Sequence, residues 1–423
     1  MADELAILRW MNISINSPVK SGVRVCNGPL MAHIESYRAR LEGLGYSAAM
    51  VLYHLRLFAK LDSWLERKQQ RLWLLNENDT DSFLHLCRIE YPAACRGAQS
   101  TLPLILQVLR DAGVVAPRKM PKTSNPAERL INEYRLFLQE QRGLDDATIC
   151  SYSRHVVRFL AEHFGTGRVN LRILGAREVT AFVRRHAPRC GRGWAAQMVT
   201  GLRSFFRFVR YQGLISLDLA MTVPPVANWA MSGLPKHLSI DAVQQVLSAC
   251  ARSTVRGKRD YAILLLLARL GLRAGEVVAL QLEDINWSTA EITVRSKKGE
   301  GWAKLPLPAD VGRSLARYLT VRPPSAHRKV FVRNYAPYTP FAASGPVSVL
   351  VRKAIERAGV KSARTGAHVF RHSLATEMLR RGASLDQIGQ VLRHRDPDST
   401  AIYAKVDLGA LRELAVRWPG GAR

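Results

Sequence analysis

The spacing of apolar positions predicts helices through the first half of the chain. Helical periodicity begins at Met31 and continues to about residue 220, with no run of alternating or β-branched residues that would indicate a strand. Residues 1–25 show no clean period, and we expect them to form a poorly ordered lead-in. The first half of the protein should therefore consist of amphipathic helices that bury one face in a core.

Two stretches of this helical half resemble each other. Residues 34–51 (IESYRARLEGLGYSAAMV) align with residues 131–149 (INEYRLFLQEQRGLDDATI). Residues 109–114 and 209–214 also match, and in each a glycine stands where a helix would end. The pattern predicts two related helical domains of about a hundred residues each, although any two small helical domains can be aligned loosely. The matched pairs are Ile34 with Ile131, Tyr37 with Tyr134, and Leu41 with Leu138.

The second half combines helices with a short hairpin. Ser239 is placed to cap a helix whose apolar periodicity starts at Val243. Residues 261–271 (YAILLLLARLG) are apolar on all sides, but about three turns are too few to span a bilayer, which indicates a buried core helix. The segments AEITVRS and AKLPLP flank KKGEG, and this pattern predicts a β-hairpin with a flexible tip.

Further helices are expected near the end of the chain. A helix that follows Gly366 should end at Gly382, and Ser384 should cap the next helix, which His394 closes. The sequence DPDST then begins a short helix that carries Tyr403, and about twenty residues remain as a tail. The predicted fold class is mainly α, with a small antiparallel sheet in the last domain.

Residues 221–236 (MTVPPVANWAMSGLPK) interrupt the helical pattern with three prolines and a glycine, which predicts a linker. On this basis we expect an extra N-terminal helical domain at 1–120 and a second helical domain at 125–220. A third domain, with the C-terminal tail, should occupy 237–423.

Charge restricts the class of function. The formal net charge is +28, and arginine outnumbers lysine, which favours a polyanionic partner such as nucleic acid. A membrane surface is a weaker alternative, because no segment approaches about 18 consecutive apolar residues. The charge is +4 for residues 1–120, +8 for 121–235 and +16 for 236–423, so the charge that would face a polyanionic partner is expected in the last two parts.

The cysteines and the N-terminus bear on the compartment. Six cysteines are scattered without a C-x-x-C pair or a histidine at metal-ligand spacing, so we expect reduced packing residues and no metal site. The N-terminal MADELAILRW carries acids where a secretory signal would carry positive charge. Both observations favour a cytoplasmic protein, which on DNA would be associated with the nucleoid.

Residues near the C-terminus suit phosphodiester chemistry. His368 and Arg371 lie three residues apart on one predicted helix, His394 follows after a turn, and Tyr403 comes nine residues later. Arg371 can direct two N–H donors at phosphate oxygens, and the histidines can exchange protons near neutral pH. Tyr403 supplies an oxygen able to form a phosphoester. Each residue alone is a weak signal, because such patterns occur by chance.

Upstream residues strengthen the interpretation. The sequence GLRAGE places Arg273 directly after the apolar core helix. Glu276 lies on the same helical face and can hold the guanidinium, although a first-turn acid is also favoured by the helix dipole alone. The hairpin tip carries Lys297 and Lys298, which by themselves would be ordinary exposed lysines.

These residues, taken in order, resemble the catalytic domain of the tyrosine recombinases, the family of phage integrases and Xer-like resolvases. The resemblance covers about residues 125–410 and implies a helical, SAM-like core-binding domain at 125–220 that clamps one face of a DNA duplex. An α+β catalytic domain would follow it. The register to the Pro-Leu pair after the hairpin selects Lys298 over Lys297. The matching positions are Arg273, Glu276, Lys298, His368, Arg371, His394 and Tyr403.

The resemblance also implies roles at the phosphate. Tyr403 would attack the scissile phosphate to form a 3′-phosphotyrosyl bond. Arg273 and Arg371 would stabilise the charge on the non-bridging oxygens, and His394 would donate a further hydrogen bond. Glu276 would support this group as a neighbour of the first arginine.

The resemblance also implies which residues transfer protons and which partners the protein has. Lys298 would protonate the departing 5′ oxygen, and His368 would assist proton transfer at the nucleophile. No ATP, other cofactor or metal is implied. The expected partner is double-stranded DNA with specific inverted-repeat sites, on which a homotetramer, or a heterotetramer with sister recombinases, exchanges strands through a Holliday junction. Integration, excision or transposition of a mobile element would be the purpose.

Some positions depart from the family pattern. Arg393 stands where these enzymes commonly have glycine before the histidine, and a bulky cation there would alter the turn or add a phosphate contact. Phe370 replaces the usual leucine, which is an apolar exchange. His372 should point off the face of Arg371, and we interpret it as structural.

Two other functions remain open from the residues. One is a type IB topoisomerase-like relaxer or hairpin resolvase that uses the same chemistry. The other is an architectural DNA-binding protein with a vestigial site, which the intact set of candidate positions argues against.

Overall fold

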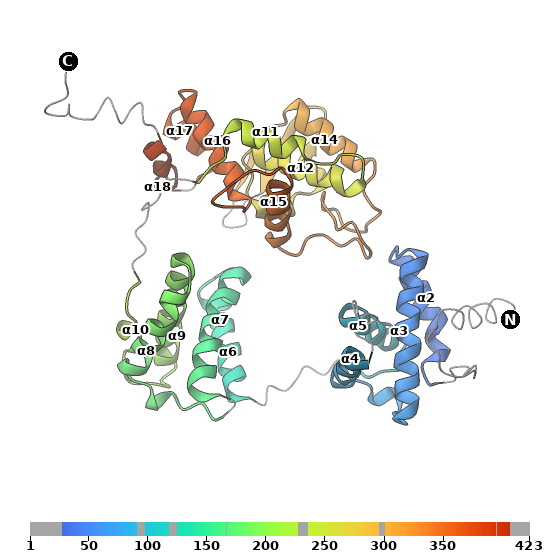
Figure 1. Ribbon diagram of the computed structural model, residues 1–423. Coiled ribbons are helices and arrows are strands. Elements are labelled where there is room, and N and C mark those ends of the chain that lie inside the picture. Colours follow the sequence, from blue (N-terminus) through green and yellow to red (C-terminus); the bar gives the residue numbers. More distant parts are fainter. Residues whose placement is uncertain are drawn as a thin grey trace, which may run out of the picture. The chain divides into compact units, whose positions relative to one another are not determined.

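The computed structural model describes residues 28–90, 98–117, 125–165, 167–226, 236–295, 301–394 and 396–406. The described chain is mainly helical and contains a three-stranded antiparallel sheet, which confirms the predicted fold class. Of these residues, 125–226 belong to one compact unit, and 28–117 and 236–406 belong to another. Figure 1 labels the helices of these parts. The expected lead-in, most of the predicted linker and the tail beyond residue 406 lie outside the described residues.

Residues 28–117 form helices around a hydrophobic core of their own. Within it, the side chain of Asp62 accepts a hydrogen bond from the Leu30 backbone N–H at 2.7 Å. This contact fixes the first described turn against the long helix α3. The elements are η1 (Met31–His33), α2 (Ile34–Gly43), α3 (Ala48–Arg67), η2 (Leu72–Leu74), α4 (Glu77–Glu90) and α5 (Ala98–Asp111).

Residues 125–226 form a second helical group with a separate core. Asn125 caps its first helix by accepting from the Ala127 N–H at 2.9 Å, and Pro126 occupies the first helical position, where its missing N–H costs nothing. The elements are α6 (Pro126–Leu136), η3 (Phe137–Gln141), α7 (Asp146–Phe164), η4 (Leu171–Ile173), α8 (Ala176–His186), η5 (Ala187–Arg189), α9 (Arg192–Tyr211) and α10 (Leu219–Thr222).

Aligned residues of the two helical groups have similar surroundings. Tyr37 in α2 and Tyr134 in α6 are both fully buried, as are Leu41 and Leu138 one turn further on. The glycines that follow α5 and α9 have left-handed φ values of +70° and +68°, as expected for residues that end helices. These matches support the sequence repeat, while the common origin of the two groups stays a prediction.

The C-terminal part contains the predicted helices and hairpin. Ser239 and Ser384 cap α11 and α17, each accepting a backbone N–H at 3.2 Å, as predicted. The elements are α11 (Ile240–Ser248), α12 (Val255–Arg269), α13 (Ala274–Ala279), η6 (Leu282–Asp284), β1 (Ile285–Asn286), β2 (Glu291–Arg295), β3 (Trp302–Pro306), α14 (Ala309–Leu319), α15 (Gly345–Arg357), α16 (His368–Arg380), α17 (Leu385–Leu392), α18 (Asp398–Ala401) and η7 (Ile402–Val406).

Two boundaries near the end differ from the prediction. α17 ends at Leu392, so His394 lies two residues beyond the helix and does not close it. Tyr403 lies in the 3₁₀ turn η7 that continues α18, so the expected short α-helix ends before the tyrosine. Tightening into a 3₁₀ turn is common where a short helix ends.

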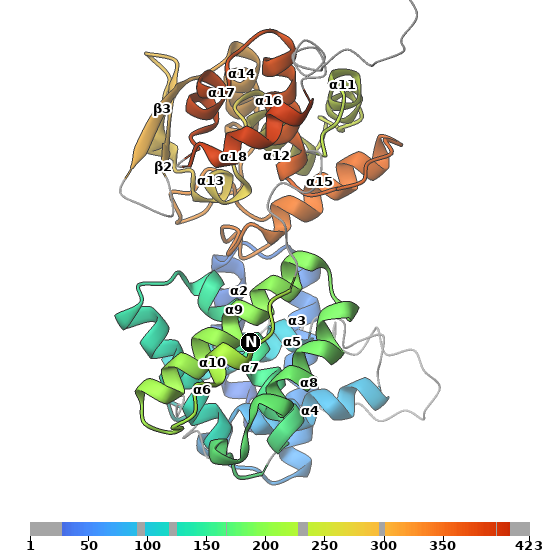
Figure 2. The same cartoon turned by 90° about the vertical axis from the view of Figure 1, so that its left-hand side faces the viewer.

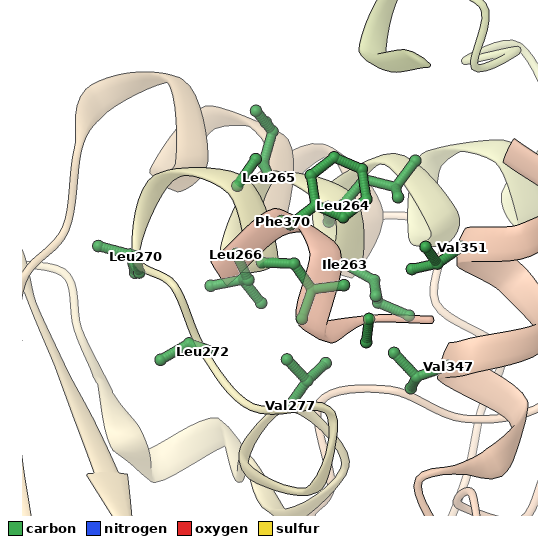
Figure 3. Packing of buried hydrophobic residues seen from close by; sticks show 14 of the residues in the cluster. Ile263, Leu264, Leu265, Leu266, Leu270, Leu272, Val277, Val347, Val351 and Phe370 are labelled. Atoms are coloured by element: carbon green, nitrogen blue, oxygen red, sulfur yellow. The ribbon is translucent and has the colours of Figure 1, made fainter. Parts of the chain in front are cut away.

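Helix α12 is the buried centre of the C-terminal part, as its all-round apolar sequence predicts. Leu264, Leu265 and Leu266 are at most 1% exposed. Figure 3 shows these leucines packed with Val351 of α15 and Phe370 of α16, the phenylalanine that replaces the usual leucine. Within the described residues, no helix combines the length and apolar character that a membrane-crossing segment needs. The core fixes α16 against α12, and α16 carries much of the candidate site.

The sheet has the order β1-β2-β3 with antiparallel pairs. Figure 2 shows β2 and β3 side by side. β2 and β3 form the predicted hairpin, in which Thr293 pairs with Lys304 and Arg295 pairs with Trp302. The tip at 296–300, with both lysines, lies outside the described residues. β1 was not predicted, because a two-residue strand carries no detectable alternation.

The described cysteines are free thiols. Cys87 and Cys250 are buried, which agrees with a packing role, but Cys150 is exposed, and for this residue the packing prediction is wrong. Cys26 and Cys95 lie outside the described residues.

Candidate active site

Arg371 on α16 connects three distant segments of the chain. Its guanidinium is nearly buried, with Nη1 donating to the Gly271 carbonyl at 2.6 Å and Nη2 donating to the Leu392 carbonyl. Each of these carbonyls lies two residues before another predicted site residue, Arg273 or His394. Burial, followed by the charge of Arg273, lowers the pKa of Arg371 to about 10, so the side chain stays protonated at neutral pH. Arg371 thus brings the motif together while it remains a cation.

Gly271 makes this convergence possible. Its φ is +57°, and a Cβ atom at this position would lie 2.7 Å from a Leu392 methyl group and 3.0 Å from one of Leu374. Both the left-handed backbone and the close approach of α16 and α17 therefore require glycine. As predicted, the chain turns here after α12 and leads directly to Arg273.

Arg273 and Glu276 form the contact that the sequence predicts. The Arg273 backbone N–H donates to Glu276 Oε2 at 2.8 Å, and its Nη1 donates to Oε1, also at 2.8 Å. Glu276 is therefore both a helix-capping acid and a partner of the guanidinium. Burial works to raise the pKa of Glu276, but the charge of Arg393 and the hydrogen bonds from Arg273 outweigh it, and the pKa is lowered. The Arg273 side chain remains 37% exposed, which leaves it accessible to a ligand.

His394 is fixed by a neighbour that sequence reasoning missed. Its Nδ1 lies 2.6 Å from the hydroxyl oxygen of the buried Thr400, and its ring is stacked with that of Tyr403 at 6.4 Å between centroids. Desolvation, and then the charge of Arg371, lower the pKa of His394 to about 4, so the imidazole is neutral at pH 7. The unusual Arg393 beside it has not displaced His394 from the cluster.

Tyr403 is 1% exposed, and its hydroxyl lies 2.9 Å from His372 Nδ1. Burial raises the pKa of Tyr403 to about 12, against an opposing effect of Arg371, so the phenol is protonated at neutral pH. Burial, and then the charge of His368, lower the pKa of His372 to about 4. The interpretation of His372 as a structural residue did not anticipate this contact, in which a neutral imidazole meets the hydroxyl of the predicted nucleophile.

His368 is the first residue of α16 and its side chain is exposed. In the described part of the chain, the Tyr403 hydroxyl is hydrogen-bonded to His372 and not to His368. Desolvation by surrounding groups, and then the charges of Arg371 and Arg273, lower the pKa of His368. The spacing of four residues between the two histidines places them on one face of α16, a signal that could have identified His372.

The cluster thus contains guanidinium groups, neutral imidazoles and a phenol in one place. Cations and N–H donors suit an anionic phosphate group, and the phenol beside them is a potential nucleophile. Among the described residues, no group of three His, Cys, Asp or Glu side chains is placed to hold a metal ion. Lys298 lies outside the described residues, between the ends of β2 and β3.

Known proteins resemble this chain in sequence. The model of the phage integrase family matches residues 236–408, which include every candidate site residue. The integrase/recombinase y4rA of Sinorhizobium fredii is 41% identical over 399 residues, covering 94% of this chain and 96% of that protein. Tyrosine recombinase XerD of Mycobacterium tuberculosis is 30% identical over 298 residues, covering 66% of this chain and 93% of XerD.

A solved structure supports the fold. The XerH site-specific recombinase, bound to a palindromic difH substrate in a post-cleavage complex, superposes with a TM-score of 0.54 at 18% sequence identity. The match covers 84% of this chain and 93% of XerH. The sequence identities show the family, whereas the structural match, at 18% identity, shows the fold alone. The chain therefore belongs to the phage integrase family of tyrosine recombinases and is a site-specific DNA recombinase.

Proposed function

We propose that this recombinase cuts and rejoins DNA with Tyr403 as its nucleophile. The observation that carries the proposal is the Tyr403 hydroxyl held by His372, in a ring stacked against His394 within the arginine cluster. Attack of the phenol oxygen on the scissile phosphorus forms a 3′-phosphotyrosyl bond and releases a 5′ hydroxyl. Attack by a 5′ hydroxyl reverses the step and releases the phenol. The phosphoester keeps the bond energy, so rejoining needs no ATP.

The two arginines are proposed to bind the non-bridging phosphate oxygens. A guanidinium has five N–H donors. Arg371 uses donors on the carbonyls of Gly271 and Leu392, and Arg273 uses donors on Glu276 and on the Arg393 carbonyl. Donors remain on each side chain, and the internal contacts fix the orientation before substrate arrives. Donors held in place in this way stabilise the charge of a phosphoryl transition state effectively.

His394 is proposed to donate the further hydrogen bond to the phosphate. A neutral imidazole has one N–H, and its position depends on the partner of the other nitrogen. If the Thr400 hydroxyl donates to Nδ1, the proton of His394 resides on Nε2 and is available to a phosphate oxygen. Thr400 would then set the tautomer of His394.

The proton that Tyr403 loses during attack has two candidate acceptors, His372 and His368. We expect replacement of His372 by phenylalanine, which keeps an aromatic ring, to slow formation of the covalent adduct by about 10²-fold or more, because the phenol loses its neighbouring base. His368→Phe should slow it less. Single-turnover rates on a nicked duplex measure both variants, and thermal unfolding shows whether either has lost its fold.

The opposite order of rates would return the role to His368, as the family resemblance implies. DNA binding would then have to move His368 to the nucleophile. Catalytic hydrogen bonds often form only when the substrate is bound, so the contacts seen without DNA do not exclude this movement. Lys298 remains the proposed general acid for the 5′ oxygen.

Double-stranded DNA with inverted-repeat sites is the proposed substrate, bound by the helical group 125–226 together with the catalytic part. In that group a pocket is lined in part by three arginines, which suit backbone phosphates. A lambda integrase tetramer bound to a Holliday junction has a similar fold, with a TM-score of 0.50. We propose a tetramer on two sites, with or without sister recombinases. The pocket residues are Arg142, Leu144, Tyr152, Thr200, Arg203, Ser204 and Arg207.

The proposed biological role is movement of a mobile element in the cytoplasm, on nucleoid DNA. The Tn1549 transposon integrase, in complex with circular intermediate DNA, has a similar fold with a TM-score of 0.50. The decisive experiment uses duplexes that carry inverted repeats from DNA flanking the gene. The proposal requires a denaturation-resistant adduct on nicked sites and a Holliday junction between intact ones. Relaxation of supercoiled plasmid without regard to sequence would instead identify a topoisomerase-like enzyme.

The N-terminal group, residues 28–117, is proposed to act mainly in assembly. The charge of +4 for residues 1–120 is half that of the second helical part at similar length, so fewer phosphate contacts are expected. We expect a fragment that starts at Ser124, one residue before the cap of α6, to form the covalent adduct on a nicked half-site. Synapsis of two full sites should weaken, as measured by native gel electrophoresis.

Half-site titrations at several salt concentrations provide the opposing readout for this fragment. The slope of the logarithm of the binding constant against the logarithm of the salt concentration is about −0.9 for each phosphate contact. If the fragment loses half-site binding and the slope flattens by several units, residues 1–120 clamp DNA directly and the assembly role is wrong.

A further inference from the structure

Arg393 has an unusual backbone for its residue type. It is the residue that ends α17, with a φ of +56° and a ψ of +50°. This left-handed conformation brings Cβ close to the following carbonyl oxygen, so glycine is the usual occupant. The arginine is therefore present in spite of its backbone preference, and its contacts show what the side chain does.

The side chain of Arg393 points into the site and is 14% exposed. Nη2 donates to Glu276 Oε2 at 2.9 Å, and Nη1 donates to the Val391 carbonyl at 3.1 Å. The Arg393 carbonyl accepts from Arg273 Nη2 at 3.1 Å. Arg393 therefore contacts Arg273 directly through its backbone, and indirectly through a shared carboxylate.

Glu276 is the link between the two arginines. Its Oε1 binds Arg273, and its Oε2 accepts both the Arg273 backbone N–H and the Arg393 guanidinium. With Arg273 alone, the carboxylate would balance the single positive charge of that side chain. With Arg393 as well, two cations share one anion, and the group keeps a net positive charge for a phosphate.

We infer that Arg393 is a positioning residue for Arg273, which it acts upon through Glu276 and through its own carbonyl. It holds the Arg273 guanidinium in place and offsets the charge of Glu276, so that Arg273 can stabilise the scissile phosphate. Arg393 itself does not touch the DNA. The inference rests on the proposed function, in which Arg273 binds the non-bridging oxygens.

The test compares Arg393→Gly with Arg393→Lys in the full-length chain. Glycine keeps the left-handed turn and the carbonyl but removes the cation, whereas lysine keeps a cation and the same backbone strain. We expect Arg393→Gly to slow single-turnover cleavage of a nicked duplex at saturating protein by about 10- to 100-fold. Arg393→Lys should recover part of this loss. DNA affinity and its salt dependence should stay at the wild-type values.

A double-mutant cycle distinguishes positioning from a general structural role. In an Arg273→Ala background, Arg393→Gly should change the residual cleavage rate by less than about twofold, because there is no longer a guanidinium to position. The control is Arg381→Ala. Arg381 also ends a helix and pairs with a glutamate, Glu377, at 2.7 Å, but this pair lies on the surface. Arg381→Ala should therefore cleave DNA at the wild-type rate.

Three outcomes overturn the inference. Cleavage by Arg393→Gly at the wild-type rate removes any role. If Arg393→Gly lowers the cleavage rate equally in the wild-type and Arg273→Ala backgrounds and also lowers the melting temperature, the side chain only stabilises the fold. A salt slope reduced by about one phosphate contact shows that Arg393 binds DNA itself. Failure of the wild-type chain to form an adduct would instead reject the proposed function, which is a separate result.

Discussion

Tyr403→Phe is expected to bind its DNA site with wild-type affinity and to form no covalent adduct. The phenylalanine ring fills the same buried space, but without the hydroxyl no phosphoester can form. Loss of the hydrogen bond to His372 should lower the free energy of unfolding by about 1 kcal/mol, which leaves the fold intact. A nicked substrate, from which the cleaved fragment diffuses away, traps the adduct of the wild-type protein for denaturing gels.

Tyr318 is the matched control for this substitution, because it is another fully buried tyrosine of the C-terminal part, in α14. Tyr318→Phe should retain adduct formation. That result would show that removal of a buried tyrosine hydroxyl does not in itself prevent cleavage. A protein–DNA adduct that persists in Tyr403→Phe would show that another residue is the nucleophile.

Lys298→Ala should slow cleavage by about 10²- to 10⁴-fold, the range expected for loss of a general acid. The antiparallel register of β2 and β3 places the lysine in the connection between Arg295 and Trp302. Single-turnover cleavage on the nicked substrate measures the effect.

Lys297→Ala is the control, because it removes the same charge from the adjacent position and should leave the rate nearly unchanged. A substrate with sulfur in place of the 5′ bridging oxygen adds a chemical test. The thiolate leaves without a proton, so this substrate should restore much of the rate of Lys298→Ala. Without such rescue, Lys298 is not the general acid.

Much of the fold was predictable because local signals were strong. The apolar run of α12, the serine caps of α11 and α17 and the alternation in the hairpin each depend on residues close in sequence. The Arg273–Glu276 contact was predictable for the same reason, because the two residues are only three apart, but Arg273 is the N-cap of α13 and not part of its helical face.

Contacts between distant segments were not predictable in this way. The hydrogen bond between Tyr403 and His372 spans 31 residues, and the ion pair between Arg393 and Glu276 spans 117. Both depend on how α16 and α17 pack against α12 and α13, and on a left-handed residue at the end of α17. The motif identified Arg273, Arg371, His394 and Tyr403, which meet in the structure, but it did not include His372 or Thr400 and did not show which partner each side chain contacts.

The carbonyl contacts of Arg371 have a consequence for reading related sequences. Because this arginine ties together Gly271 and Leu392, 100 and 21 residues away, its loss should lower the stability of the domain as well as stop the chemistry. A descendant that no longer recombines DNA but still binds it would be free to lose Tyr403, while the fold would still favour retention of Arg371. The presence of this arginine in a relative therefore indicates an intact scaffold, and activity has to be judged from the tyrosine.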